Sequence, residues 1–173
     1  MIVAVLEVLA FLVLPVAAFL AGAAWMQCYS GARRRPGALN LRFGGYDARA
    51  VAGYWHGEDL DAERQLLRLD LAFPVYYGAN ALAAFAFALS RLGLDDRFGW
   101  AVALVAIVMV ADWIENTIQL AQLARYAGGG EAALQPSAVR VASVATQVKL
   151  AGSTALVVAN LALGAWMLVQ AFG

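Results

Sequence analysis

Apolar residues fall in four long runs, and shorter polar or glycine-rich stretches separate them. The runs cover about residues 2–27, 66–92, 100–126 and 137–172. Each reaches or exceeds the roughly 20 residues that an α-helix needs to cross a bilayer. Short connections make successive helices neighbours of opposite direction. We therefore predict an all-α, polytopic membrane protein with four transmembrane helices in an antiparallel bundle, the whole chain (1–173) being one domain.

The segment from about residue 30 to residue 65 differs from the four runs, because it is rich in arginine, glycine and proline and cannot span a membrane. Within it, Asp47 is placed to cap a short helix that ends near Trp55. The first run has no basic residues before it and is too long for the apolar part of a signal peptide. We expect that run to be a retained membrane helix and not a cleaved leader.

Composition supports lipid as the solvent. Apolar residues make up 63% of the chain, charged residues make up 14%, and the mean hydropathy is +0.70; soluble domains have about 45–50% and about 25%. Twelve basic residues balance twelve acidic ones, which argues against a nucleic-acid partner. One cysteine (Cys28) and one histidine (His56) exclude a disulfide framework and leave no zinc ligand set. We expect no metal and no cofactor.

Arginine is distributed unequally between the two sides of the predicted bundle. Nine arginines lie in the long loop or at helix ends on its side, and they are Arg33, Arg34, Arg35, Arg42, Arg49, Arg64, Arg68, Arg125 and Arg140. Arg91 and Arg97 lie on the other side. Basic loops favour the cytoplasm. This bias predicts a cytoplasmic segment over about residues 30–65, with both termini outside.

The third run carries a polar stripe. Its members recur every three or four residues and are Asp112, Glu115, Asn116, Gln119 and Gln122. Such spacing places them on one helix face, and Ile107, Val110, Ile114 and Ile118 lie on the opposite face. A carboxylate at mid-depth in hydrocarbon costs about 2.5–3.5 kcal/mol or more, so the stripe must face a protein interior or a water-filled cleft. We therefore take Asp112 and Glu115 as candidate site residues.

Polar groups of the other helices fall at a similar depth. In the second run, Pro74 has no N–H, so the carbonyl of Asp70 loses its helix partner and we expect a kink there. Tyr77 and Asn80 follow on that helix. Lys149, the single lysine of the chain, lies in the fourth run. If Lys149 is deep, Asp112 or Glu115 is its natural partner.

Several short motifs of the chain resemble those of an uncharacterised family of small bacterial four-span membrane proteins. The motifs are Phe43-Gly44-Gly45-Tyr46, Glu63-Arg64, Asp70 with Phe73-Pro74 and Tyr77, and Asp112 with Glu115-Asn116. The resemblance covers roughly residues 41–125 and brings no activity with it. It implies the bacterial inner membrane as the location, and a recurring residue set that includes Tyr46, Glu63 and Arg64.

Three functions stay open, and the sequence leaves undecided whether the chain is an enzyme. The first is binding, with or without modification, of a lipid or isoprenoid-like ligand in a pocket open to the cytoplasmic side. In an enzyme, Asp112 and Glu115 would serve as general acid and base. The predicted ligand contacts are Asp70, Tyr77, Asn80, Asn116, Gln119, Lys149, Arg64 and Arg68, with aromatic lining from Phe73, Tyr76, Tyr77 and Trp113.

The second function is that of an accessory or scaffold subunit of a membrane complex, in which a paired polar core only fixes the helices. The third is a proton- or cation-coupled carrier that acts as an oligomer. The expected partners are membrane lipids, a small apolar ligand with a polar head, and a second copy or a membrane-complex subunit. Asp112→Asn and Glu115→Gln would discriminate, since a structural core loses stability whereas a catalytic site loses turnover.

Overall fold

The computed structural model describes residues 2–31 and 39–172, and this part of the chain contains helices and turns without strands. The long helices are α1 (Ile2–Ser30), α4 (Phe73–Arg91), α5 (Phe98–Gly129) and α6 (Pro136–Phe172). Shorter elements are η1 (Leu39–Leu41), α2 (Ala48–Trp55), α3 (Leu60–Asp70), η2 (Asp95–Arg97) and η3 (Gly130–Ala133). Arg33, Arg34 and Arg35 lie outside the described residues.

Four stretches are long and apolar enough to cross a membrane, as in a multi-pass membrane protein. They are Val5–Ser30, Leu60–Arg91, Asp95–Ala133 and Pro136–Phe172. The prediction of an all-helical chain with four candidate spans is thus confirmed. The second stretch is not one continuous helix, because α3 and α4 meet at a break over residues 71–72.

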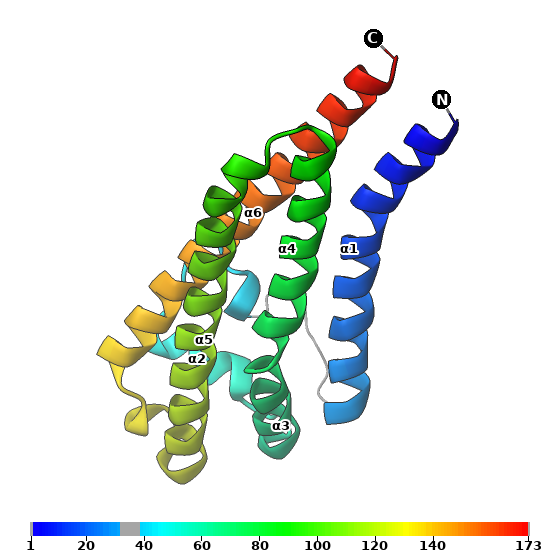
Figure 1. Cartoon of the computed structure of the whole chain (residues 1–173). Helices are drawn as coiled ribbons and strands as arrows, with labels where there is room; N and C mark the ends of the chain where they lie inside the picture. The colour runs from blue at the N-terminus through cyan, green and yellow to red at the C-terminus, as the bar shows by residue number, and fades with distance from the viewer. Residues whose placement is uncertain (1, 32–38, 173) are drawn as a thin grey trace.

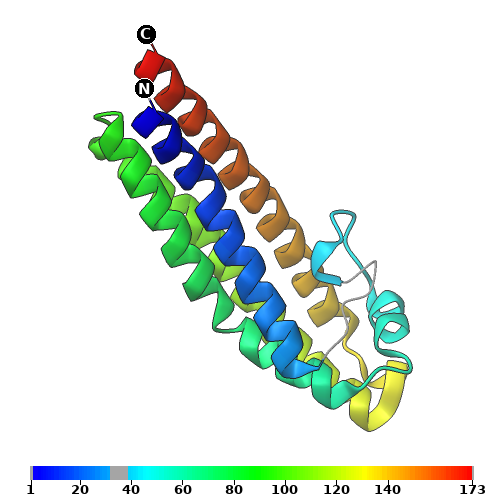
Figure 2. The ribbon, with the colours of Figure 1, turned by 90° about the vertical axis from the view of Figure 1, so that its right-hand side faces the viewer.

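The helices lie side by side along one direction (Figure 1). Both chain termini lie at the same end as the α4–α5 turn, and we call this the terminal end. The opposite end, which we call the loop end, carries α2, α3 and η3 (Figures 1 and 2). Helix α5 packs on α4 and on α6, and α1 packs on α4 and α6. The four helices therefore form a closed ring of neighbours.

A glycine lies at each of the four contacts in this ring. A Cβ would come within 3.0 Å of a side chain of the facing helix at Gly22 (α1 on α4), Gly78 (α4 on α5), Gly152 (α6 on α5) and Gly164 (α6 on α1). Helices associate in lipid through close packing, and small residues permit the backbones to approach. The four glycines therefore set how near each helix lies to its neighbour.

The terminal half of the bundle has an apolar core. Its buried members are Val8, Phe11, Phe85, Ala88, Leu89, Ala101, Leu163 and Met167. One ion pair joins two helices at this end, with Arg91 Nη2 2.5 Å from Glu7 Oε2, and both side chains are partly exposed.

The long connection between α1 and α4 folds over the loop end. Its two short helices begin at aspartates. Asp47, the cap expected from the sequence, accepts a hydrogen bond at Oδ1 from the Ala50 N–H (2.8 Å), and Asp59 caps α3. The buried face of α2, with Val51 and Trp55, packs in one core cluster with residues of α3, α5 and α6. This packing covers the end of the bundle in which the polar stripe of α5 lies.

In the part of α5 that carries the stripe, polar side chains lie on the inside of the bundle and apolar side chains lie on the outside. Asp112, Glu115 and Asn116 are buried, whereas Ile107 and Ile114 are 53% and 42% exposed. A soluble helix shows the reverse arrangement. The predicted interior position of the stripe is thus confirmed, and the exposed apolar face is suited to lipid.

Candidate functional site

The break between α3 and α4 leaves two backbone carbonyls without helical partners. Pro74, near the start of α4, has no N–H to offer the carbonyl of Asp70. The N–H of Val75 turns to the carbonyl of Ala72 (3.2 Å), so the carbonyl of Leu71 is also left open. The sequence predicts a kink at Pro74. The structure shows a break of two residues there, after which α4 begins as a new helix.

Two side chains of α5 bind these carbonyls. Asn116 Nδ2 donates to the carbonyl of Asp70 (3.2 Å), and Trp113 Nε1 donates to the carbonyl of Leu71 (2.7 Å). Because the two residues are three apart, they lie one above the other on the face of α5 toward the break. Unsatisfied backbone groups are costly in lipid, so these bonds fix the break against α5.

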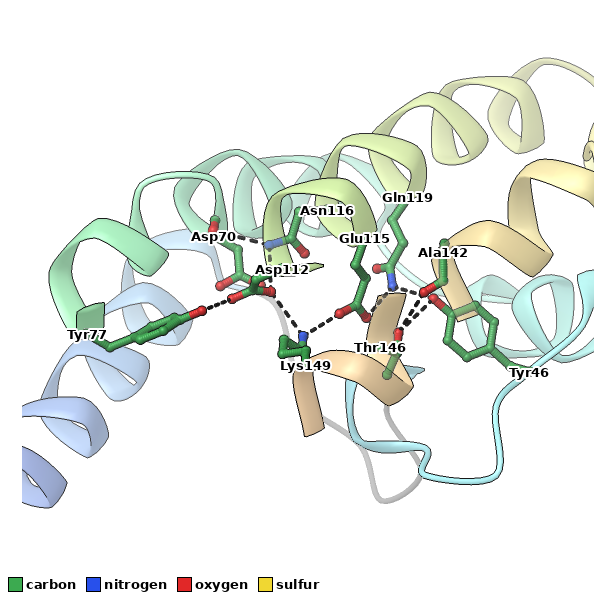
Figure 3. A network of polar contacts seen from close by, with 10 residues as sticks. All are labelled: Tyr46, Asp70, Tyr77, Asp112, Glu115, Asn116, Gln119, Ala142, Thr146 and Lys149. Atoms are coloured by element: carbon green, nitrogen blue, oxygen red, sulfur yellow. Dashed lines mark hydrogen bonds and ion pairs between the residues drawn. The ribbon is translucent and has the colours of Figure 1, made fainter. Parts of the chain in front are cut away.

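Next to this junction, one ammonium group lies between two carboxylates (Figure 3). Lys149 Nζ of α6 is 3.0 Å from Asp112 Oδ1 and also pairs with Glu115 Oε2. Exposure of the three side chains is 12% for Lys149, 6% for Asp112 and zero for Glu115. We call these three residues the triad. The sequence predicts that a deep Lys149 would pair with Asp112 or Glu115. In the structure, Lys149 is buried and pairs with both.

Asp112 is the end of the triad that faces α4. Its Oδ2 accepts a hydrogen bond from Tyr77 Oη (2.9 Å), and its Oδ1 also accepts one from Asn116 Nδ2 (3.2 Å). The Asp70 side chain is buried as well, and its backbone carbonyl accepts from the same Asn116 amide. Two predicted residues, Tyr77 and Asn116, thus bind Asp112, and Asp70 is joined to them through Asn116.

Glu115 is the end of the triad that faces the loop. Gln119 Nε2 lies 2.9 Å from Glu115 Oε1 and 3.1 Å from Tyr46 Oη, and it donates to both. Thr146 donates to the carbonyl of Ala142 (3.1 Å), so the Tyr46 hydroxyl acts as the donor in its 3.2 Å contact with Thr146 Oγ1. Figure 3 shows a continuous row of polar contacts from Tyr46 to Tyr77.

The segment around Tyr46 is held on α6 by its backbone as well. The Tyr46 N–H donates to Ser143 Oγ (2.8 Å), and Gln147 Nε2 donates to the carbonyl of Phe43 (3.2 Å). Gly45 has a φ of +76°, a conformation that favours glycine, and a Cβ there would lie 2.7 Å from Ser143 Oγ. Ser143 and Gln147 were missed by the sequence reasoning, although they are one helical turn apart and lie on the same face of α6.

Burial raises the pKa of the Tyr46 hydroxyl above its ordinary value of 10.0, because a phenolate would be desolvated there, and the nearby Glu115 carboxylate acts in the same direction. Tyr46 therefore stays protonated at neutral pH and remains a hydrogen-bond donor to Thr146.

Other predicted residues lie apart from the triad. Asn80 Nδ2 donates to the carbonyl of Tyr76 in its own helix (2.8 Å), Arg64 pairs with Asp61 in α3, and Arg68 is exposed. Two of the aromatic side chains expected to line the site, Tyr76 and Trp113, are instead 43% and 36% exposed. No group of three or more metal-ligating side chains occurs among residues 2–31 and 39–172.

When all three groups are ionised, the triad has a formal charge of −1, since two carboxylates face one ammonium. A buried charge without a counter-charge costs several kcal/mol. Within residues 2–31 and 39–172, Lys149 is the one cation that pairs with these two carboxylates, so the triad is suited to one further positive charge or proton.

The sequence matches no protein-family model, and comparisons with curated proteins and with solved structures found no match. The interpretation of the site accordingly depends on its own geometry and chemistry.

Proposed function

We propose that the chain crosses the bacterial inner membrane four times as an antiparallel bundle, with its loop end toward the cytoplasm and both termini outside. The arginine distribution supports this orientation. Helices α5 and α6 have 32 and 37 residues, which corresponds to about 48 and 55 Å at a rise of 1.5 Å per residue. The hydrocarbon core is about 30 Å thick, so part of each helix would project beyond it.

We further propose that the triad binds the head group of a lipid or isoprenoid-like ligand, and that this head is cationic or donates hydrogen bonds. The observation that carries the proposal is the excess of one carboxylate in a buried site that also holds an ammonium. An ammonium or hydroxyl head supplies the hydrogen-bond donor, and an ammonium also supplies the missing charge. Asp112 and Glu115 are the expected contacts, and Lys149 keeps the two acids apart.

The test measures thermal unfolding of the protein in phosphatidylcholine nanodiscs that contain hexadecylamine, hexadecanol or palmitic acid. A molecule that binds the folded state alone raises its stability. Hexadecylamine should raise the Tm of the native chain, hexadecanol should raise it less, and palmitic acid should leave it unchanged. Asp112→Asn and Glu115→Gln should each abolish the effect of the amine.

Glu7→Gln is the matched control, because Glu7 is also an ion-paired carboxylate but lies in the terminal half. It should respond to the amine as the native chain does. If hexadecylamine leaves the native Tm unchanged, or raises the Tm of every variant equally, the triad is not a site for a cationic head.

A second candidate function is a structural lock inside an accessory membrane subunit. It is favoured by one observation: Asp112, Glu115 and Lys149 already pair with one another, and Asn116 joins Asp112 to the break beside α4. A lock predicts a large loss of stability in Asp112→Asn and no response of the native chain to any of the three probes.

A further inference from the structure

We infer that the apolar chain of the ligand lies in the seam between α1 and α4, and that its head reaches Asp112 by taking the place of the Tyr77 hydroxyl. This inference rests on the proposed function and adds the route and the position of the ligand. In this arrangement, the Tyr77 side chain separates the triad from the bilayer.

Tyr77 connects the polar site to an aromatic cluster. Its hydroxyl donates to Asp112 Oδ2 at 2.9 Å, and its ring lies 5.5 Å from the ring of Phe73 and 6.0 Å from the ring of Phe19. Phe19 belongs to α1 and is 43% exposed on the outside of the bundle. Two neighbouring rings, those of Phe19 and Tyr77, therefore lie between the outside of the bundle and Asp112.

The seam is formed by the most weakly buried of the four spans. Helix α1 has the smallest buried share of any candidate span. At the loop half it approaches α4 at Gly22, where the rings of Phe73 and Tyr76 fill the space that a Cβ would occupy. The contacts are aromatic side chains, which can change rotamer while the helix backbones stay in place.

The opposite end of the polar row is closed more firmly. The Tyr46 hydroxyl is hydrogen-bonded to Gln119 and to Thr146, next to Glu115. The segment around Tyr46 is also hydrogen-bonded to Ser143 and Gln147 of α6. Entry there would require several hydrogen bonds to break together. Entry through the seam requires two hydrogen bonds to break, from Tyr77 to Asp112 and from Tyr76 to the Ala18 carbonyl, and a ligand O–H or N–H replaces the first of them at Asp112 Oδ2.

The experiment uses the full chain in phosphatidylcholine nanodiscs and two carbodiimides, which add to carboxyl groups: dicyclohexylcarbodiimide, which dissolves in lipid, and a water-soluble carbodiimide. Labelling of Asp112 is followed by peptide mass mapping. Tyr77→Phe keeps the ring and removes the hydrogen bond. Tyr126→Phe is the matched control, because Tyr126 also lies in the loop half but its ring packs 5.7 Å from the ring of Trp55 and not in the seam.

Tyr77→Phe should raise the rate at which the lipid-soluble reagent labels Asp112 by about tenfold, the factor that corresponds to one hydrogen bond to a charged group. Tyr126→Phe should leave the rate unchanged, and the water-soluble reagent should label Asp112 slowly in both variants. The inference is overturned if Tyr77→Phe behaves as Tyr126→Phe does, or if the rate of labelling by the water-soluble reagent rises as much as that by the lipid-soluble reagent.

Protection by N,N-dimethylhexadecylamine separates this inference from the proposed function, because its protonated head has an N–H but cannot form an amide with an activated carboxyl group. Protection of Asp112 in the native chain supports both. If Tyr77→Phe raises the labelling but this amine gives no protection, the route through the seam stands and the cationic head is wrong.

Discussion

The two halves of the bundle differ in the kind of contact that holds their helices together. In the terminal half, the helices meet through apolar side chains such as Phe85 and Leu89, and the ion pair between Arg91 and Glu7 lies at the partly exposed edge. In the loop half, α4, α5 and α6 meet through the triad and its hydrogen bonds, whereas α1 packs there through an apolar cluster that includes Ala23 and Met26. Lipid is as apolar as leucine, so apolar contacts alone select helix partners weakly there. The polar half therefore determines which faces meet.

The strongest test of this contrast is Lys149→Met, which keeps the length of the side chain and removes its charge. Two buried carboxylates would then lie without a cation, and the free energy of unfolding should fall by about 3–5 kcal/mol. Denaturation in mixed detergent micelles, followed by circular dichroism, measures this. Arg91→Met, at the partly exposed pair of the terminal half, should cost less than about 1 kcal/mol.

A compensating variant sharpens the same comparison. The triple substitution Asp112→Asn, Glu115→Gln and Lys149→Met removes every charge of the triad together and should recover most of the stability lost in Lys149→Met. If the triple variant is as unstable as Lys149→Met, unbalanced charge is not the cause of the loss.

The apolar half should respond less strongly to truncation. Leu89 is 1% exposed, and Leu89→Ala should cost about 2 kcal/mol, at the low end for buried leucine, because the removed methyl groups would not move to water when helices separate in lipid. Val75→Ala on the same helix is the control, since Val75 is 54% exposed and should change little. Equal losses in the two variants would show that the terminal core is not closely packed. The measurement is the same micelle titration.

The junction at the α3–α4 break should show smaller effects. Asn116→Leu removes the bonds to the Asp70 carbonyl and to Asp112, and it should cost about 1–2 kcal/mol. Trp113→Phe removes one bond to the Leu71 carbonyl, for which about 0.6 kcal/mol is expected. Amide hydrogen exchange of residues 71–75 should rise in both variants, whereas Thr117→Val, on the exposed side of α5, should leave it unchanged.

The smallest effect concerns pH. Because the pKa of Tyr46 lies above 10.0 in the folded chain, its contribution to stability is present below pH 10 and is lost as the pH rises further toward its folded pKa. The near-ultraviolet absorbance of the native chain minus that of Tyr46→Phe should show one tyrosine that ionises above pH 10. Ionisation at or below pH 10 would contradict the buried position of this hydroxyl.

Spacing was enough to predict the stripe of α5 and its interior position, because a carboxylate has few places to lie in a membrane helix. The pairing of Lys149 with Asp112 or Glu115 was predicted only for a deep Lys149, because the length of the fourth run does not determine the depth at which this residue lies. The disruption of the helix at Pro74 was predictable, because proline lacks the N–H that would bond to a carbonyl four residues earlier in the same helix.

The contacts of Tyr46 could not be derived in the same way. Ser143 and Tyr46 are 97 residues apart, and their contact depends on how the loop folds back on α6. Asn80 and Arg64 were assigned to the ligand by residue type, yet each has a partner within one turn of its own helix. Local partners compete well for such side chains, and a pattern of polar positions does not reveal that competition.

The separation of the triad along the chain has a consequence for biosynthesis. Asp112 and Glu115 leave the ribosome before Lys149 does. An unpaired acid at the centre of a helix raises the free energy of membrane insertion by about 2.5–3.5 kcal/mol. Helix α5 would therefore be a poor substrate for the translocon by itself. We expect it to wait at the interface until α6 has been synthesised, and the two helices to enter the bilayer as one hairpin that already carries its counter-ion.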